Sequence, residues 1–387
     1  MSNGDTGDTT AASASRQGLR IFGWSPVDLL LKLRTFIALI LVIIVFSFIA
    51  PNFFTVRNML VTATHITVFG VLSLGMTLVM LTAGIDLSVG SVAGLAGMLA
   101  GWFVNQGIQF GNVTIYLTFP VIIIVVLIVG ALLGAVNGFF ITRFAVPPFI
   151  ATLGMLHVGR GFALLTSEGQ TFPNLNRYPL LHQLMQGNPS EEQIREAVTV
   201  IPGLRSGAER LASTSFEVIG TEYFLGVPIM VWIMIVLAIL FAWVSKKTRF
   251  GRHVYAVGGN EDAARLSGVR VKRIKMAVYM ISSACAALVG VMLASKLVAS
   301  HPSTGETYEL TTIACVVLGG TSLMGGRGSI LGSIIGACVI VILTDGLVMT
   351  GVSSMWQRVF IGAVIVAAVV LDHIQQRVEE RRATGAV

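Results

Sequence analysis

The chain has 387 residues, of which 54% are hydrophobic and only 12% are charged, and its formal net charge is +7. An ordinary soluble domain carries about 25% charged residues, so this chain has too little charge to cover a water-facing surface. The composition excludes a soluble enzyme, a disordered chain and a disulfide scaffold, and predicts an all-α polytopic membrane protein. In so apolar a chain, excess Lys and Arg indicates the cytoplasmic side of a membrane and no nucleic-acid partner.

The N-terminal segment 1–33 is a polar tail followed by a basic lead-in. Residues 1–18 are rich in Ser, Thr, Gly and Asp and cannot bury enough apolar surface to order themselves, so we expect a disordered tail. The tail contains two aspartates, and no small-residue cleavage site follows the first apolar run at 36–50. We therefore interpret that run as a retained membrane span and not as a secretory signal.

Ten segments are long and apolar enough to be helices that cross a bilayer, which needs about 20 mostly apolar residues. They lie near 34–50, 59–81, 86–104, 114–140, 148–166, 226–244, 275–297, 310–325, 329–349 and 355–372. With the N-terminus inside, the segments assigned to the cytoplasm hold 18 of the 26 Lys and Arg residues. This charge bias predicts a membrane domain over 34–372, a cytoplasmic tail at 373–387 and two cytoplasmic termini.

Two Gly-rich segments, 81–101 and 318–337, interrupt the apolar pattern. In each, a cluster of Gly, Ser and Thr separates an entering helix from a leaving helix that has Gly at four-residue spacing. Helix packing alone explains such spacing, as it does for Gly130, Gly134 and Gly138. The clusters themselves predict non-helical backbone, which at membrane depth must be buried or line a wet cavity. We expect two broken helices from weakly repeated halves that meet at a central pathway.

The breaks contain the side chains and backbone expected to line that pathway. These residues are Gly84, Asp86, Ser88, Gly319, Gly320, Thr321 and Ser322. An ionisable group in the bilayer is by default a functional candidate, but Asp86 is also placed to cap the helix that follows it.

Three polar residues outside the breaks carry open alternatives. Asp345 either lines a pathway or ends its helix, and Arg160 either faces the pathway or snorkels to the membrane surface. Asn137 either makes a hydrogen bond between helices, which we favour, or contacts the ligand.

The outward segment 167–225 is the one long stretch between predicted spans on that side. It contains SEEQIREAV beside several prolines. Because a loop of this length without structure is uncommon, we expect a short amphipathic helix within it.

The loop 245–275 has the strongest local signal. Asn260 is a good N-cap, Glu261 and Asp262 put negative charge at the positive end of a helix, and Gly268 can close the other end. The pattern predicts a helix of about two turns between basic arms.

So short a helix is marginal alone in water and must dock on something. A solvated basic loop explains the arms but not the capped, Ala-rich middle. We expect docking on a partner through Asn260, Glu261, Ala263, Ala264, Arg265, Ser267 and Gly268.

No chemistry of its own is visible in the chain. It lacks the GxxxxGK[ST] phosphate loop, a metal-ligand spacing and a nucleophile–base arrangement. We therefore expect no catalytic residue, no metal and no cofactor in this chain, and any use of ATP would require a separate protein.

Four separated motifs resemble the permease subunits of ribose- and xylose-type monosaccharide ABC importers. They are LTAGIDLSVGS (81–91), VPPFIATLGM (146–155), FGRHVYAVGGNEDAARLSGV (250–269) and ELTTIACVVLGGTSLMGGRGSILG (309–332), and the resemblance covers 35–372. It implies a homodimer in the inner membrane, ATP-binding cassette subunits that bind ATP-Mg below it, and a periplasmic sugar-binding protein above it. It also implies sugar import, with 258–268 as the coupling helix. The outward segment 167–225 is longer than usual for this family.

An ion-coupled secondary transporter or channel that uses Asp86 or Asp345 is the alternative from another class. It explains the broken helices equally well but leaves the capped loop helix unexplained. A strict requirement for a separate ATPase distinguishes the two.

Overall fold

The computed structural model describes residues 26–110, 113–115, 117–173, 175, 216–353, 355–364, 366–367 and 370. The expected disordered tail at 1–18, the amphipathic helix expected near 190–198 and the tail 373–387 lie outside the described residues. The first helix already begins at Pro26, ahead of the membrane-domain boundary expected at 34.

The first part of the described chain contains five long helices and one small hairpin. They are α1 (Pro26–Ile49), α2 (Val56–Leu81), α3 (Val89–Asn105), β1 (Ile108–Phe110), β2 (Val113–Ile115), α4 (Phe119–Arg143) and α5 (Pro148–Leu165). In the antiparallel hairpin Ile108 pairs with Ile115. The strand pairing explains why α4 begins at 119 and not at the expected 114.

The second part begins with a short helix and another hairpin. The elements are α9 (Val218–Thr221), β3 (Tyr223–Phe224), β4 (Val227–Pro228), α10 (Ile229–Lys247), α11 (Arg249–Gly259), α12 (Glu261–Leu266), α13 (Val271–Leu297), α14 (Tyr308–Leu318) and α15 (Ile330–Met349). Tyr223 pairs with Pro228 in the antiparallel β3–β4 hairpin, and residues 355–364 are also helical.

The polytopic, all-α architecture is confirmed. Six of the described helices are long and apolar enough to cross a membrane, and Thr35–Ile49, Val89–Asn105 and Tyr308–Leu318 form shorter apolar helices. The tenth expected span, 355–372, is only partly described, so the count of ten stays a prediction.

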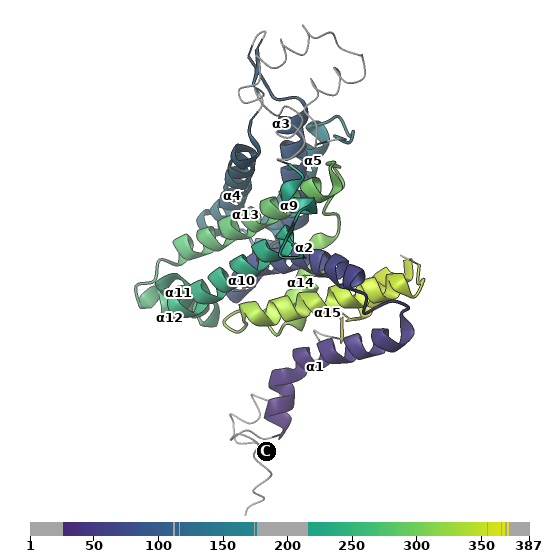
Figure 1. Cartoon of the computed structure of the whole chain (residues 1–387). Coiled ribbons are helices and arrows are strands. Elements are labelled where there is room, and N and C mark those ends of the chain that lie inside the picture. The colour runs from purple at the N-terminus through teal and green to yellow at the C-terminus, as the bar shows by residue number, and fades with distance from the viewer. Residues whose placement is uncertain are drawn as a thin grey trace, which may run out of the picture.

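The core of the bundle is built around α2 and α13, which Figure 1 shows near its middle. The apolar windows of these two helices are 83% and 67% buried, whereas those of α5 and α10 are only 22% buried. The outer helices therefore offer apolar side chains to lipid, while α2 and α13 are covered by protein.

The glycine stripe of α4 allows this helix to lie directly against α13. A Cβ atom on Gly134 would overlap the Tyr279 carbonyl oxygen, and one on Gly138 would lie 2.9 Å from the Cα of Met276. Small residues at four-residue spacing are the usual means of close helix contact in lipid. The packing interpretation of this stripe is confirmed.

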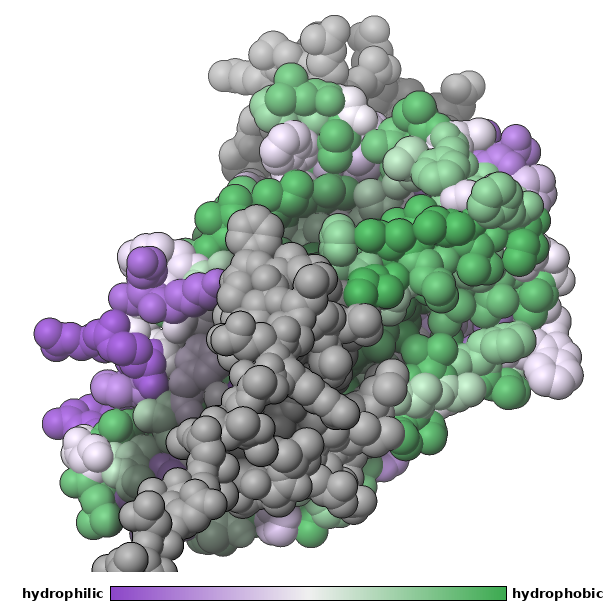
Figure 2. Space-filling view, turned by 90° about the horizontal axis from the view of Figure 1, so that it is seen from below, coloured by the Kyte–Doolittle hydropathy of each residue, from purple (hydrophilic) through white to green (hydrophobic). Residues whose placement is uncertain are grey.

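The surface divides into an apolar body and a basic end. In Figure 2 the hydrophilic residues gather on the left, the side on which Figure 1 shows α11 and α12. Eight exposed cations lie at this end: Lys246, Lys247, Arg249, Arg252, Arg265, Arg270, Lys272 and Arg273. By the positive-inside rule this end is expected to face the cytoplasm.

Candidate functional site

The loop helix predicted from the sequence is α12, and its cap is confirmed. The Asn260 side chain accepts a hydrogen bond from the backbone N–H of Ala263 at 2.9 Å. Glu261 and Asp262 lie in the first turn, where negative charge is favourable. Asn260 thus fixes the start of α12.

The C-terminal end of α12 is closed as predicted. Gly268 has a φ of +84°, which glycine adopts without a steric penalty. The N–H of Gly268 donates to the Arg265 carbonyl, and the N–H of Val269 donates to the Ala264 carbonyl, both at 3.0 Å. These two bonds are the Schellman arrangement of a helix end.

The two faces of α12 differ sharply. Ala264 is buried among apolar residues that include Val254 and Val271, while Lys275 Nζ donates to Glu261 at 2.5 Å and ties α12 to α13. The expected docking residues Asn260, Ala263, Arg265, Ser267 and Gly268 are exposed. The Ala264 side chain therefore packs α12 against the rest of this chain, and it is too buried to contact a partner.

Leu266 was not among the expected docking residues, yet it is 90% exposed. It is the last residue of α12, where an apolar side chain stands among exposed polar neighbours. The sequence shows a leucine here but does not show which face it occupies.

The basic arm before α12 is itself a helix, α11, which the sequence pattern did not predict. Thr248 caps it by accepting from Gly251 N–H at 3.2 Å, and Val254 and Val257 are buried on its inner side. Because its apolar face packs against the bundle, this short helix gains the tertiary support that it lacks alone.

Helix α11 also contacts the end of α2, directly before the first break, and the second break itself. A Cβ atom on Gly258 would overlap the Leu81 carbonyl and lie 2.6 Å from Gly326 N. Gly326 N–H in turn donates to the Leu81 carbonyl at 3.0 Å. The end of α11, the end of α2 and the second break thus meet in direct backbone contact.

Tyr255 adds a side-chain link between α11 and the second break. Its hydroxyl donates to the Gly328 carbonyl at 2.9 Å. Burial raises the pKa of Tyr255 above its ordinary value, so the hydroxyl keeps its proton, and this hydrogen bond, throughout the physiological range.

The first break, between α2 and α3, is held by Asp86. One carboxylate oxygen accepts from Ser88 N–H at 3.0 Å and from Ser88 Oγ at 2.6 Å, and the other accepts from Ser282 Oγ of α13 at 2.8 Å. Asn137 of α4 donates to Ser88 Oγ at 3.0 Å, which confirms the expected hydrogen bond between helices. Asp86 supports the turn before α3, although the N-cap position of α3 is Ser88.

The second break, 319–329, joins α14 to α15. Gly320 adopts a φ of +86°, and Gly319 packs so closely on α15 that a Cβ atom would lie 2.5 Å from the carbonyl carbon of Gly332. Thr321 and Ser322 are both buried. The non-helical backbone expected in both segments is confirmed.

Within the described part of the chain, the expected pathway residues are largely closed off from solvent in this conformation. Gly84, Asp86, Ser88, Thr321 and Ser322 are buried, and Gly319 and Gly320 are half-buried. Their place in a pathway therefore stays a prediction that requires a rearranged conformation.

Arg160 of α5 faces protein and does not snorkel. Its guanidinium donates to the carbonyls of Pro302 and Thr304, the latter at 2.9 Å. It therefore holds the loop between α13 and α14 against α5.

A pocket of about 360 Å³ lies at the opposite end of the bundle from α12, lined by α2, α13, α14, α15 and Ile361. His65 Nδ1 lies 3.1 Å from each carboxylate oxygen of Asp345 within it. The sequence identified Asp345 as a notable intramembrane acid, but not its partner, which is distant in the chain. Neither open alternative for Asp345 included this pair.

An all-α bundle with lipid-facing apolar sides, broken central helices and one basic end defines a membrane transport protein with several spans. Residues 58–369 match the family described as "Branched-chain amino acid transport system / permease component". The chain belongs to this permease family.

Individual relatives of similar length also match the chain. The chain is 37% identical to a ribose import permease of Haemophilus influenzae, over 89% of this chain and 94% of the relative. It is 39% identical to a ribose import permease of Bacillus subtilis, over 88% of this chain and 92% of the relative. It is 34% identical to a xylose transport system permease of Escherichia coli, over 90% of this chain and 93% of the relative. No solved structure matches the chain.

Proposed function

We propose that this chain is the membrane-spanning subunit of an ATP-driven importer that carries a monosaccharide or related polyol from the periplasm to the cytoplasm. The observation that carries the proposal is the similarity, along nearly the whole chain, to permeases named for ribose and for xylose. The family description mentions branched-chain amino acids, but the two sugar names come from full-length relatives at 34–39% identity.

The coupling surface proposed for this importer is the exposed face of α12. Two copies of the chain would form the permease in the inner membrane, with both termini in the cytoplasm and a periplasmic sugar-binding protein on the other side. Cassette subunits would bind ATP-Mg and dock on α12 with Leu266 as the apolar anchor. Supporting this, Leu266 is 90% exposed on a helix capped at both ends.

A direct route connects this surface to the pathway. Any displacement of α12 and α11 acts on Leu81 and Gly326, because Gly258 is in contact with both. Leu81 directly precedes the first break, and Gly326 lies within the second, so both contacts are close in the chain to the expected pathway residues. We infer that movement of the coupling surface opens the breaks, while the chain itself hydrolyses nothing.

The test is uptake by cells that lack this permease and receive it back on a plasmid. Wild-type protein should restore uptake of radiolabelled ribose or xylose but not of leucine. Uptake of leucine alone would show that the family description, and not the named relatives, indicates the solute.

A matched pair of variants tests the docking anchor. Leu266→Glu removes an apolar contact worth about 1.5–3 kcal/mol when buried, so association with the cassette subunit should weaken at least tenfold. Leu225→Glu makes the same change at a leucine that is 78% exposed beyond the other end of α10 and should leave association intact. Normal association in Leu266→Glu would remove α12 as the docking site.

A further inference from the structure

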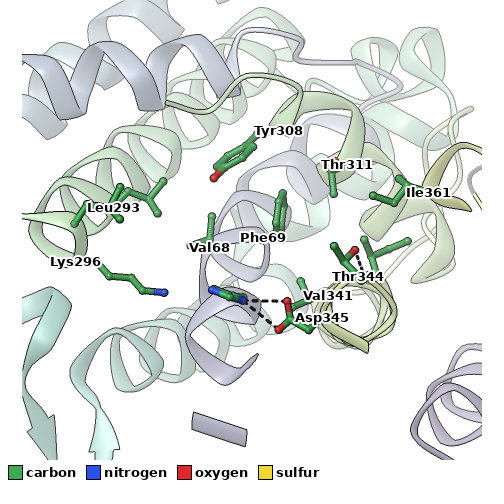
Figure 3. Close-up of a pocket in the computed structure, with 13 residues that line it drawn as sticks. Val68, Phe69, Leu293, Lys296, Tyr308, Thr311, Val341, Thr344, Asp345 and Ile361 are labelled. Carbon is green, nitrogen blue, oxygen red and sulfur yellow. Dashed lines mark hydrogen bonds and ion pairs between the residues drawn. The ribbon is translucent and has the colours of Figure 1, made fainter. Parts of the chain in front are cut away.

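The pocket at the end of the bundle opposite α12 is lined by ionisable, hydroxyl-bearing and apolar side chains. Figure 3 shows Lys296 extending from α13 towards Asp345 of α15, with the rings of Phe69 and Tyr308 on the facing side. Lys296 is the penultimate residue of α13, which begins beside α12 at Val271. At 1.5 Å per residue, the pocket lies about 38 Å along α13 from the coupling surface.

The pocket concentrates ionisable groups where lipid would otherwise penalise them. His65, Lys296 and Asp345 all line it, and charged groups within membrane helices typically mark a solute or ion route. Within the described residues, Lys296 donates no hydrogen bond to a protein group. Its ammonium group, which carries three N–H donors, is therefore available to a ligand in the cavity.

The cavity also offers hydrogen-bond acceptors. An ionised Asp345 only accepts, and its two oxygens have more lone pairs than His65 uses. The hydroxyls of Thr311 and Thr344 donate to carbonyls of their own helices at 3.3 and 2.8 Å, which leaves their oxygens free to accept. Donors and acceptors side by side suit a ligand that carries hydroxyl groups.

Two aromatic rings form one wall. The Phe69 and Tyr308 ring centroids are 5.0 Å apart, with an interplanar angle of 55°. Such rings provide rigid apolar area against which the C–H face of a sugar ring can pack. A volume of about 360 Å³ falls in the usual range of small-molecule sites, about 300–1,000 Å³.

The ammonium group of Lys296 argues against use of the pocket by a coupling cation. A sodium ion at Asp345 would lie near the ammonium group of Lys296, and His65 already contacts both carboxylate oxygens. Like charges in a cavity of low dielectric constant repel strongly. A neutral polyhydroxyl ligand meets no such repulsion.

We propose that this pocket binds a monosaccharide at the outer end of the permease, with Lys296 and Asp345 hydrogen-bonding its hydroxyl groups and Phe69 and Tyr308 packing against its ring. The proposal rests on the proposed function and adds to it the residues that would meet the solute first.

Protection of an introduced cysteine tests the pocket without relying on transport. Thr311→Cys lines the pocket, whereas Leu310→Cys is adjacent, 55% exposed and not part of the lining. Methyl methanethiosulfonate labelling is followed by mass spectrometry on the assembled importer in nanodiscs. Cys285 and Cys315 are buried and Cys338 is half-buried, so the unmodified chain gives the background.

Ribose or xylose should slow labelling of Thr311→Cys several-fold and leave Leu310→Cys unaffected. Adding Lys296→Met or Asp345→Asn should raise the sugar concentration for half-protection about tenfold, because each removes a charge-assisted hydrogen bond.

Three results would overturn the pocket assignment: protection by sodium or leucine instead of sugar, no protection in an importer that transports sugar, or an unreactive Thr311→Cys because a second copy closes the cavity. An importer that carries no sugar at all would instead refute the proposed function. The two failures are therefore distinguishable.

Discussion

Two neighbouring glycines at the end of α11 have very different surroundings. A Cβ atom on Gly258 would overlap the Leu81 carbonyl, whereas one on Gly259 would have no atom within 4 Å. The backbone contact between α11 and the end of α2 therefore depends on the absence of a side chain at one position only.

Gly258→Ala should reduce solute uptake at least tenfold, because the methyl group separates α11 from Leu81 and breaks the route from α12 to the breaks. Gly259→Ala should retain near-normal uptake. Both are measured in the complemented cells, with the amount of protein in the membrane as the control. Equal uptake by the two variants would contradict the proposed route.

Asn260 is predicted to hold α12 in place by capping it. Asn260→Ala removes the hydrogen bond to Ala263 N–H and should cost about 1 kcal/mol of local helix stability. Hydrogen exchange of the 261–268 amides should accelerate by roughly fivefold, while Asn260→Asp, which also caps well, should exchange at about the wild-type rate. Unchanged exchange in Asn260→Ala would show that tertiary packing alone holds the helix.

At the scale of the helices, the packing is tested most directly at the close contact between α4 and α13. Gly134→Leu forces a side chain into the Tyr279 carbonyl, and overpacking of this kind costs about 1–3 kcal/mol or more. Gly161→Leu on α5 meets open space and serves as the matched control. Thermal denaturation in detergent should show a clearly lower Tm for Gly134→Leu and little change for Gly161→Leu.

Local signals in the sequence predicted some elements well. The ends of α12 followed from Asn260 and Gly268, because caps depend on the few residues around them. Helix α11 was missed because its stability comes from burying Val254 and Val257 against other helices, which a basic and glycine-containing stretch does not reveal.

Tertiary contacts limited what could be predicted of the sites. The two breaks were expected from their Gly, Ser and Thr clusters, yet the contact of Gly326 with Leu81 joins segments far apart in the chain. The pair of His65 and Asp345 likewise joins residues that are far apart in the chain. Ala264 and Leu266 are both apolar, and only the structure shows that the first faces inward and the second outward.

For the whole molecule, the proposed orientation puts α12 in the cytoplasm and the β3–β4 hairpin outside. Asp262→Cys and Leu225→Cys place thiols at positions that are 85% and 78% exposed. In intact spheroplasts, a membrane-impermeant maleimide should label only Leu225→Cys, and both should react after lysis. The reverse pattern would invert the topology.

The central claim is that a separate motor drives this bundle from its basic end. The most direct measurement is sugar uptake into proteoliposomes that hold the purified permease with its binding protein, with and without the cassette subunit and ATP-Mg. We predict uptake only when the cassette subunit and ATP-Mg are both present. Equal uptake by the permease without the cassette subunit, driven by an imposed ion gradient, would contradict the account.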